Sequence, residues 1–210
     1  MKNELIKRIL SSLILIPIAL FFIIKGSFLF NFFIIICFLI TVYEWHNMSK
    51  NKPYYIFGHI FLLFSFYCVY IVRNESQENS LFIFLLILLI CISTDVGGYV
   101  FGKIFKGPKL TKISPNKTYS GALGSIILSL TTVLFLTYYF VQIIDLKIVI
   151  VAIMTSIFCQ IGDLIFSFLK RKARLQDTGT ILPGHGGILD RLDGILLGVP
   201  LGFITFILIY

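Results

Sequence analysis

The sequence predicts an all-α integral membrane protein, a polytopic bundle of about seven transmembrane helices with a polar cavity that faces the cytoplasm. Of its 210 residues, 58% are hydrophobic and only 13% are charged, and the mean hydropathy is +0.96. An ordinary soluble domain is closer to half apolar and about a quarter charged. Apolar runs long enough to cross a ~30 Å bilayer core recur along the chain. Because no polar stretch is long enough to fold separately, we expect residues 1–210 to form one transmembrane domain.

Apolar runs define the expected transmembrane helices, and we take their bounds from run length rather than periodicity. In order, the runs are Ile9–Ile24, Phe28–Tyr43, Ile56–Val72, Leu81–Phe101, Gly121–Phe140, Ile148–Leu169 and Gly194–Tyr210. Only Lys25-Gly26-Ser27 separates the first two, which predicts a tight helical hairpin. The basic N-terminus is followed by no cleavage site of the A-x-A kind, so we expect an anchored first helix.

The distribution of Lys and Arg predicts the orientation in the membrane. Most of the 18 such residues lie at the N-terminus or in the connections 44–55, 102–120 and 170–193. The exceptions are Lys25, Arg73 and Lys147. Short cytoplasmic loops are enriched in basic residues. The basic connections are therefore expected to face the cytoplasm from the inner (cytoplasmic) membrane, with the C-terminus outside.

Composition also excludes several kinds of function. The four cysteines lie singly in different apolar runs, without Cys/His ligand spacing, which argues against a zinc site or a disulfide framework. The aromatic residues show no alternation with basic residues of the kind found in nucleic-acid binders, so no nucleic-acid partner is expected. The basic residues that give the chain its net charge of +8 are instead expected to contact membrane lipid headgroups and nucleotide phosphates.

Asp95 interrupts the fourth apolar run. A carboxylate inside a membrane is costly and by default functional. Asp95 lies in the segment Ser93–Gly98, where two glycines would let a neighbouring backbone or a ligand approach closely. The alternative is an aspartate that reaches the nearby cytoplasmic interface. Glu44, which is followed by Trp45 and His46, is expected to be only a membrane-interface anchor.

The lysine-rich connection 102–120 contains no acidic residue. Its spaced lysines fit a positive-inside signature and a contact with anionic lipids. The segment Ser114-Pro115-Asn116-Lys117-Thr118 is more specific. It places a hydroxyl and the Lys117 ammonium where the next helix begins, and the free amides there suit a phosphate.

The chain is organised around residues 160–193, QIGDLIFSFLKRKARLQDTGTILPGHGGILDRLD. If the first part is helical, Asp163, Ser167 and Lys170 share one face. Asp190 and Asp193 lie one turn apart at the entrance to the last run. Brought together across a bundle, Asp163 and Asp190 would repel unless a cation lay between them. Mg²⁺ is the expected ion, because it takes hard oxygen ligands and shares the remainder with substrate phosphates.

Basic residues and a glycine turn complete the candidate site. Lys170, Arg171 and Arg191 are expected to clamp phosphate oxygens. His185 is expected to donate a hydrogen bond in a turn where Gly186-Gly187 lets backbone amides reach an anion. For Lys172 and Arg174, the other members of the basic cluster, the preferred interpretation is that they belong to the positive-inside signature of the membrane topology.

The run S-x-x-K-R-x(5)-D-x-G-x(3)-P-G-H-G-G-x-x-D-R-x-D, from Ser167 to Asp193, resembles the signature of the phosphatidate cytidylyltransferases. Asp95, Gly102-Lys103 and Ser114–Thr118 stand where that family has comparable residues. The resemblance implies transfer of a cytidylyl group from CTP to phosphatidate, giving CDP-diacylglycerol and pyrophosphate for phospholipid synthesis. It also implies a divalent metal, with residues 1–94 supplying N-terminal helices and residues 95–210 the catalytic half.

Carried over by position, the resemblance implies that Asp163 and Asp190 bind the metal, with Asp193 supporting them and a second cation as an open alternative. Lys170 and Arg191 are then expected to act in catalysis. The residues expected to line the substrate site are Asp95, Lys117, Ser167, Arg171, His185, Gly186 and Gly187. The chain departs from the family pattern at Gln176, where the family has Lys, and at Ser120, where it has Glu.

Two other functions fit parts of the sequence. A CTP-dependent kinase of a membrane lipid alcohol would use the same nucleotide, but the full run from Ser167 to Asp193 disfavours it. An ion-coupled transporter would use Asp95 and Asp163 as ion sites, yet no inverted repeat of the kind common in transporters occurs.

The last apolar run carries a glycine stripe. Gly194, Gly198 and Gly202 recur at every fourth residue. Small residues at this spacing allow two helices to approach closely. The stripe therefore indicates a close helix contact, either within the bundle or between two subunits of a homodimer.

Overall fold

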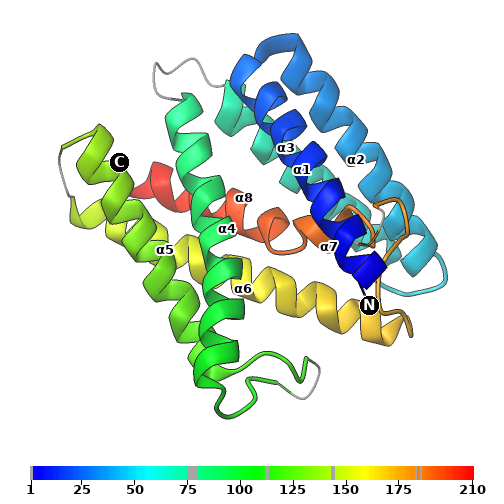
Figure 1. Cartoon of the computed structure of the whole chain (residues 1–210). Helices are drawn as coiled ribbons and strands as arrows, with labels where there is room; N and C mark the ends of the chain where they lie inside the picture. Colours follow the sequence, from blue (N-terminus) through cyan, green and yellow to red (C-terminus); the bar gives the residue numbers. More distant parts are fainter. Residues whose placement is uncertain (1, 75–79, 112–113, 143–144, 183, 185) are drawn as a thin grey trace. The chain divides into compact units, whose positions relative to one another are not determined.

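The computed structural model describes residues 2–74, 80–111, 114–142, 145–182, 184 and 186–210, with side chains from Ser11 onward. This part of the chain is helical and contains no strand (Figure 1). Its helices are α1 (Lys2–Lys25), α2 (Ser27–Ser49), α3 (Tyr55–Asn74), α4 (Ser80–Phe105), α5 (Tyr119–Phe140), α6 (Leu146–Lys172), α7 (Leu189–Leu192) and α8 (Ile195–Ile209). Every predicted apolar run falls inside one of them, apart from one residue at each end of the last run.

The helices have the length and composition of membrane spans. Those long and apolar enough to cross a membrane are α2, α3, α4, α5, α6 and the segment Leu189–Ile209, and α1 contains the shorter apolar stretch Ser11–Lys25. Large apolar side chains stay exposed on them, such as Leu13 at 68%, Phe57 at 73% and Leu208 at 79%. A soluble protein would bury such surface, whereas lipid tails cover it in a bilayer. The predicted multi-pass helical membrane protein is confirmed.

Contacts along the chain divide it into two compact units. Unit 1 comprises Met1–Leu81 and Lys170–Leu192, and unit 2 comprises Phe82–Leu169 and Asp193–Tyr210. The boundaries fall inside α4, inside α6 and between α7 and α8. Each unit therefore combines segments that are distant in the sequence. That residues 1–210 act as one transmembrane domain stays a prediction.

In unit 1, α2 packs on both α1 and α3 (Figure 1). Gly26 joins α1 to α2 with a φ of +63°, a conformation that favours glycine. Arg73 of α3 closes this turn, because its Nε donates to the carbonyl oxygen of Ile23 at 2.9 Å and its Nη2 to that of Ile24 at 3.3 Å. Arg73 thus satisfies carbonyl groups at the end of α1. The predicted tight hairpin is confirmed.

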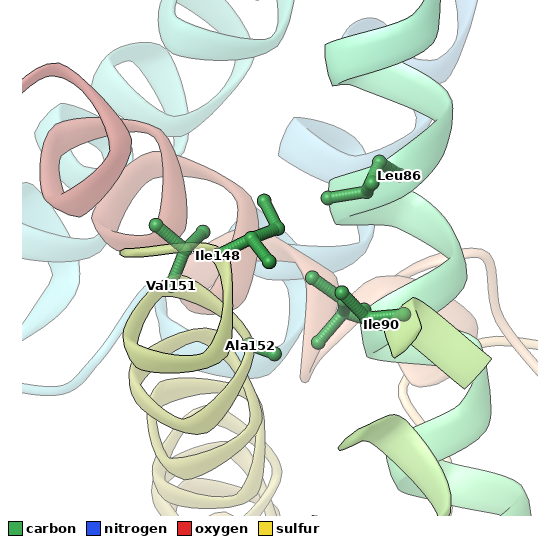
Figure 2. Close-up of a cluster of buried hydrophobic side chains, with 6 residues drawn as sticks. Leu86, Ile90, Ile148, Val151 and Ala152 are labelled. Atoms are coloured by element: carbon green, nitrogen blue, oxygen red, sulfur yellow. The ribbon is translucent and has the colours of Figure 1, made fainter. Parts of the chain in front are cut away.

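In unit 2, a buried apolar core joins α4, α5 and α6. Its members are Leu86, Ile90, Val133, Ile148, Val151 and Ala152. Figure 2 shows Leu86 and Ile90 of α4 facing Ile148 and Ala152 of α6. This core holds together the helices that carry Asp95, on α4, and Asp163, on α6.

The glycine stripe of α8 faces α6 within unit 2. A Cβ on Gly194 would lie 2.7 Å from Sγ of Cys159, and one on Gly198 would lie 3.2 Å from Cβ of the same cysteine. A Cβ on Gly202 would overlap Thr155. Glycine is therefore needed at these positions for the two helices to pack this closely. Of the two interpretations of the stripe, a close contact within the bundle is confirmed, and the stripe no longer argues for a homodimer.

Candidate active site

Lys170 and two backbone amides of the segment 170–192 converge on Asp190 in unit 1. Lys170, in the last turn of α6, donates from Nζ to Oδ1 of Asp190 at 2.9 Å, and the two side chains are 12% and 3% exposed. Thr178 and Gly187 donate their backbone N–H groups to Oδ2 at 2.8 and 2.9 Å. Bonds to a charged acceptor are stronger than neutral ones. The carboxylate of Asp190 therefore fixes the connection between α6 and α7, and we name the described residues of this connection, 173–182, 184 and 186–188, the site loop.

A second buried carboxylate holds the site loop from the side of α2. Glu44 is 1% exposed. Its Oε1 accepts a hydrogen bond from the backbone N–H of Ile188 at 3.0 Å. Its Oε2 accepts from the N–H of Leu189 at 2.8 Å and from the hydroxyl of Thr178 at 3.2 Å. The prediction that Glu44 is a membrane-interface anchor is wrong, because the carboxylate is buried among loop donors within unit 1.

Trp45, the residue after Glu44, is also buried rather than interfacial, and its contacts fix the end of α2. Trp45 donates from Nε1 to the carbonyl oxygen of Tyr55 at 3.1 Å. A Cβ on Gly58 would overlap the indole ring, so α3 packs directly on it. The end of α2 that carries Glu44 is therefore locked against α3.

Glycines allow the site loop to approach both carboxylates. A Cβ on Gly187 would lie 2.5 Å from Oε2 of Glu44, and one on Gly179 would lie 2.6 Å from Oε1. Gly186 has a φ of +82°, and a Cβ there would lie 2.9 Å from Oδ2 of Asp190. These distances leave no room for a side chain. The amide that reaches an anion in this turn is that of Gly187, and the anion is a carboxylate of the chain itself.

The remaining basic residues of unit 1 are more open to solvent. Arg171 and Arg191 have exposed side chains, whereas Lys170 is mostly buried against its aspartate. Lys172 lies over the ring of Tyr54, with Nζ 5.3 Å from the ring centroid. Burial raises the pKa of the Tyr54 hydroxyl. Arg171 and Arg191 are thus predicted site residues whose guanidinium groups are open to a ligand that arrives from water.

In unit 2, Asp163 is joined to the lysine-rich connection. Nζ of Lys117 forms an ion pair with Oδ2 of Asp163, and the Ser167 hydroxyl donates to Oδ1 at 3.3 Å. The side chains of the ion pair are 25% and 31% exposed. Thr118 caps α5 by accepting the backbone N–H of Gly121 at 3.1 Å. The start of α5 therefore positions Lys117 at Asp163, although the sequence presents the two as separate features.

Asp95 and Asp193 also lie in unit 2, close to the start of α8. Oδ1 of Asp95 is 3.8 Å from the position that a Cβ on Gly194 would take. Asp193 accepts the backbone N–H of Gly194 on Oδ1 at 2.9 Å. The carbonyl oxygen of Asp193 is 2.8 Å from the Cβ position of Gly162. The start of α8 therefore packs against Gly162, the residue before Asp163 on α6.

The predicted site residues therefore form two groups. Unit 1 contains the pair Lys170–Asp190 and unit 2 contains the pair Lys117–Asp163. The helix predicted from Asp163 to Lys170 is confirmed by α6. Because the two carboxylates belong to different units, their pairing around a metal stays a prediction, and His185 lies outside the described residues. Carboxylates beside ammonium and guanidinium groups suit a polyphosphate ligand with a hard cation.

Glu44 and Thr178 are the site residues that the sequence analysis missed. Thr178 connects Asp190 with Glu44, since its N–H donates to Asp190 and its hydroxyl to Glu44. A signal for Glu44 exists in the sequence. It is an acid at the end of an apolar run, and the rule applied to Asp95 also covers it. Thr178 carries no such signal, because a threonine in a polar turn is ordinary.

Known proteins resemble this chain over nearly its whole length. A family model described as the cytidylyltransferase family matches residues 6–74 and 54–209. A Rickettsia felis protein named phosphatidate cytidylyltransferase is 36% identical over 220 residues, covering 99% of this chain and 94% of that protein. A Staphylococcus saprophyticus protein of the same name is 42% identical over 73% of this chain and 61% of its own length. This chain therefore belongs to the cytidylyltransferase family.

Proposed function

We propose that this chain transfers a cytidylyl group from CTP to phosphatidate, giving CDP-diacylglycerol and pyrophosphate for phospholipid synthesis. The observation that carries the proposal is the match to the Rickettsia felis phosphatidate cytidylyltransferase along both chains. The multi-pass helical fold supports it, because phosphatidate resides in the membrane while CTP dissolves in water. A nucleotidyltransferase for this pair needs polar groups at the ends of membrane helices, where Lys117 and Lys170 lie.

In this reaction an oxygen of the phosphatidate phosphate forms a bond to the α-phosphorus of CTP. The bond from that phosphorus to the β-phosphate oxygen breaks, and pyrophosphate leaves with its electron pair. Little covalent chemistry falls to the protein, so catalysis consists of positioning and of neutralising charge. The guanidinium groups of Arg171 and Arg191 can each donate two parallel hydrogen bonds to the oxygens of a phosphate. The Lys170 ammonium, held by Asp190, adds a fixed positive charge.

Mg²⁺ is the metal proposed for this site, with a second cation as an open alternative. The carboxylate oxygens fit a hard cation. Asp163 is partly exposed. Among the described residues only Lys170 donates to Oδ1 of Asp190, which leaves a lone pair on that oxygen. No group of three or more His, Cys, Asp or Glu forms a metal cage in the described part of the chain. Mg²⁺ commonly binds one or two carboxylates and completes its shell with water and substrate phosphates. When bound, it would neutralise phosphate charge.

We further propose that the site lies in a polar cavity that faces the cytoplasm, in the inner (cytoplasmic) membrane. The bacterial origin of the similar proteins supports the membrane assignment. The basic connections 102–120 and 170–193 support the orientation, because such loops stay on the cytoplasmic side. These connections contain Lys117, Lys170 and Arg191, so the residues proposed to bind CTP would all be on the side where the nucleotide is found.

The test of this function is CDP-diacylglycerol formation by the purified protein from radiolabelled CTP and phosphatidate. We expect the activity to require Mg²⁺ and to fall at least ~100-fold in Asp163→Asn and in Asp190→Asn, since each removes a carboxylate charge proposed to hold Mg²⁺ at the reacting phosphates. Asp145→Asn, in the connection before α6, is the matched control and should retain wild-type activity. CTP turnover only with a lipid alcohol would indicate the kinase, and ion uptake without turnover would indicate a transporter.

The sequence analysis also left open that the protein forms a homodimer. The glycine stripe that suggested it packs within unit 2. A second subunit would therefore have to contact another face of the helices. Cross-linking in native membranes that yields only monomer would remove the homodimer from the proposal.

A further inference from the structure

We infer that Glu44 is a positioning residue, which holds the site loop closed on α2 and thereby sets the geometry of Lys170 and Asp190. Its kinetic consequence rests on the proposed function, whereas its structural basis is the set of contacts within unit 1. Glu44 lies on α2, far from Asp190 in the sequence, and no role follows for it from the signature in residues 167–193.

The first step of the argument is the identity of the groups on Glu44. The N–H groups of Ile188 and Leu189 and the hydroxyl of Thr178 all act as donors, so both carboxylate oxygens are acceptors. Two of these donors come from the end of the site loop and its junction with α7, and the third comes from earlier in the loop. One side chain of α2 therefore ties together two distant points of the same loop.

The second step is that the two carboxylates share the same loop residues. Thr178 gives its hydroxyl to Glu44 and its N–H to Asp190. Gly187 gives its N–H to Asp190, while its α-carbon is so close to Glu44 that a Cβ would lie 2.5 Å from Oε2. Of the residues that give Asp190 its two backbone donors, Thr178 is thus bonded to Glu44 and Gly187 packs directly against it. If Glu44 released the loop, Asp190 and its partner Lys170 would lose their fixed orientation.

The third step concerns burial. A carboxylate that is 1% exposed is costly unless its acceptors are satisfied. Every donor that reaches Glu44 in the described part of the chain belongs to the segment 178–189. Opening the loop would leave the carboxylate buried and unsatisfied, so the loop is driven to stay closed.

The main test is Glu44→Gln in the assay for CDP-diacylglycerol formation. Glutamine keeps the shape but replaces one oxygen with an NH₂ group, which cannot accept from a backbone N–H. Either Ile188 or Leu189 then loses its acceptor. Because Glu44 is buried and its oxygens accept from the loop, we expect kcat to fall about 10- to 100-fold while the KM for CTP stays within about threefold of wild type. A wild-type kcat in Glu44→Gln would overturn the inference.

Limited trypsin digestion in detergent gives a second readout that needs no turnover. Arg174 lies within the site loop, Arg191 follows the loop in α7, and both side chains are exposed. Because cleavage follows the population of locally open states, we expect the loop of Glu44→Gln to be cut at Arg174 several-fold faster than in wild type. Unchanged cleavage would overturn the inference. Faster cleavage of Glu44→Gln beside an inactive wild type would uphold the role in holding the loop and sink the proposed function instead.

Two further variants separate positioning from folding. Thr41→Val removes another fully buried polar group of α2, a hydroxyl that donates to the carbonyl oxygen of Cys37 in its own helix, and should leave kcat and cleavage unchanged. Thr178→Val removes one donor to Glu44 and leaves the N–H on Asp190. We expect it to lower kcat about 3- to 10-fold. If Glu44→Gln does not accumulate in membranes, Thr178→Val with wild-type kcat would still overturn the inference.

Discussion

Each aspartate proposed to bind metal is held by a lysine from another segment of its own unit. Lys117 of the connection before α5 pairs with Asp163 of α6, and Lys170 at the end of α6 pairs with Asp190 of α7. The second pair is the more buried of the two, and backbone amides of the site loop complete its hydrogen bonds. An ion pair of this kind contributes little to stability when it is exposed. Its value here is that it fixes the direction of a carboxylate.

The ion pair between Lys117 and Asp163 in unit 2 predicts that replacing Lys117 lowers kcat/KM more than replacing another lysine of the same connection does. We expect Lys117→Gln to lower kcat/KM roughly tenfold, or ~1.4 kcal/mol, because Asp163 loses the cation that orients it. The matched control is Lys109→Gln, which removes an exposed lysine from the same connection and should leave kcat/KM unchanged. The measurement is initial rate against CTP concentration for both variants. Equal effects of the two substitutions would show that only the total charge of the loop matters.

At the scale of helices, the packing of α8 depends on its glycines. Gly198 is the middle of the stripe, where a Cβ would lie 2.8 Å from Sγ of Cys91 and 3.2 Å from Cβ of Cys159. A side chain there meets α4 and α6 at once. Overpacking costs typically ~1–3 kcal/mol, whereas the gain in helix propensity from replacing glycine is at most ~1 kcal/mol. The unfavourable term is therefore the larger one.

We accordingly expect Gly198→Val to destabilise the protein by ~1–3 kcal/mol and to lower its Tm in detergent by several degrees. Ile207→Val is the control on the same helix, since Ile207 is 57% exposed and its truncation should shift the Tm little. Thermal unfolding of both variants, followed by loss of monodisperse protein, makes the comparison. A Tm of Gly198→Val at or above that of wild type would contradict the close packing of α8.

For the whole molecule, the sequence predicted the helices well because apolar run length is a strong signal in membrane proteins. It also predicted the helical face of Asp163 and Lys170, which depends on local periodicity alone. It did not predict that Lys117 meets Asp163 or that Glu44 meets Thr178. Those contacts depend on how polar connections fold back onto helices, and neither run length nor spacing encodes that path. Glu44 also shows that the aromatic-belt interpretation fails where an acid is buried.

Orientation in the membrane is a property of the whole chain and leads to the last prediction. The excess of Lys and Arg in alternate connections predicts that residues 44–55 face the cytoplasm and that the connection before α6 faces outside. We expect Asn51→Cys to react with a membrane-impermeant maleimide only in inside-out vesicles, and Lys147→Cys only in right-side-out vesicles. Both positions are exposed in the structure.

The wild-type protein provides the background for this labelling, because its four cysteines all lie within helices that can span the membrane. Labelling of both variants from the same side would mean that an odd number of spans does not separate the two connections. Labelling with the sides exchanged would place Lys117 and Lys170 outside the cell, away from CTP. In that case the proposed cytidylyl transfer could not occur on these residues, whatever activity the detergent-purified protein shows.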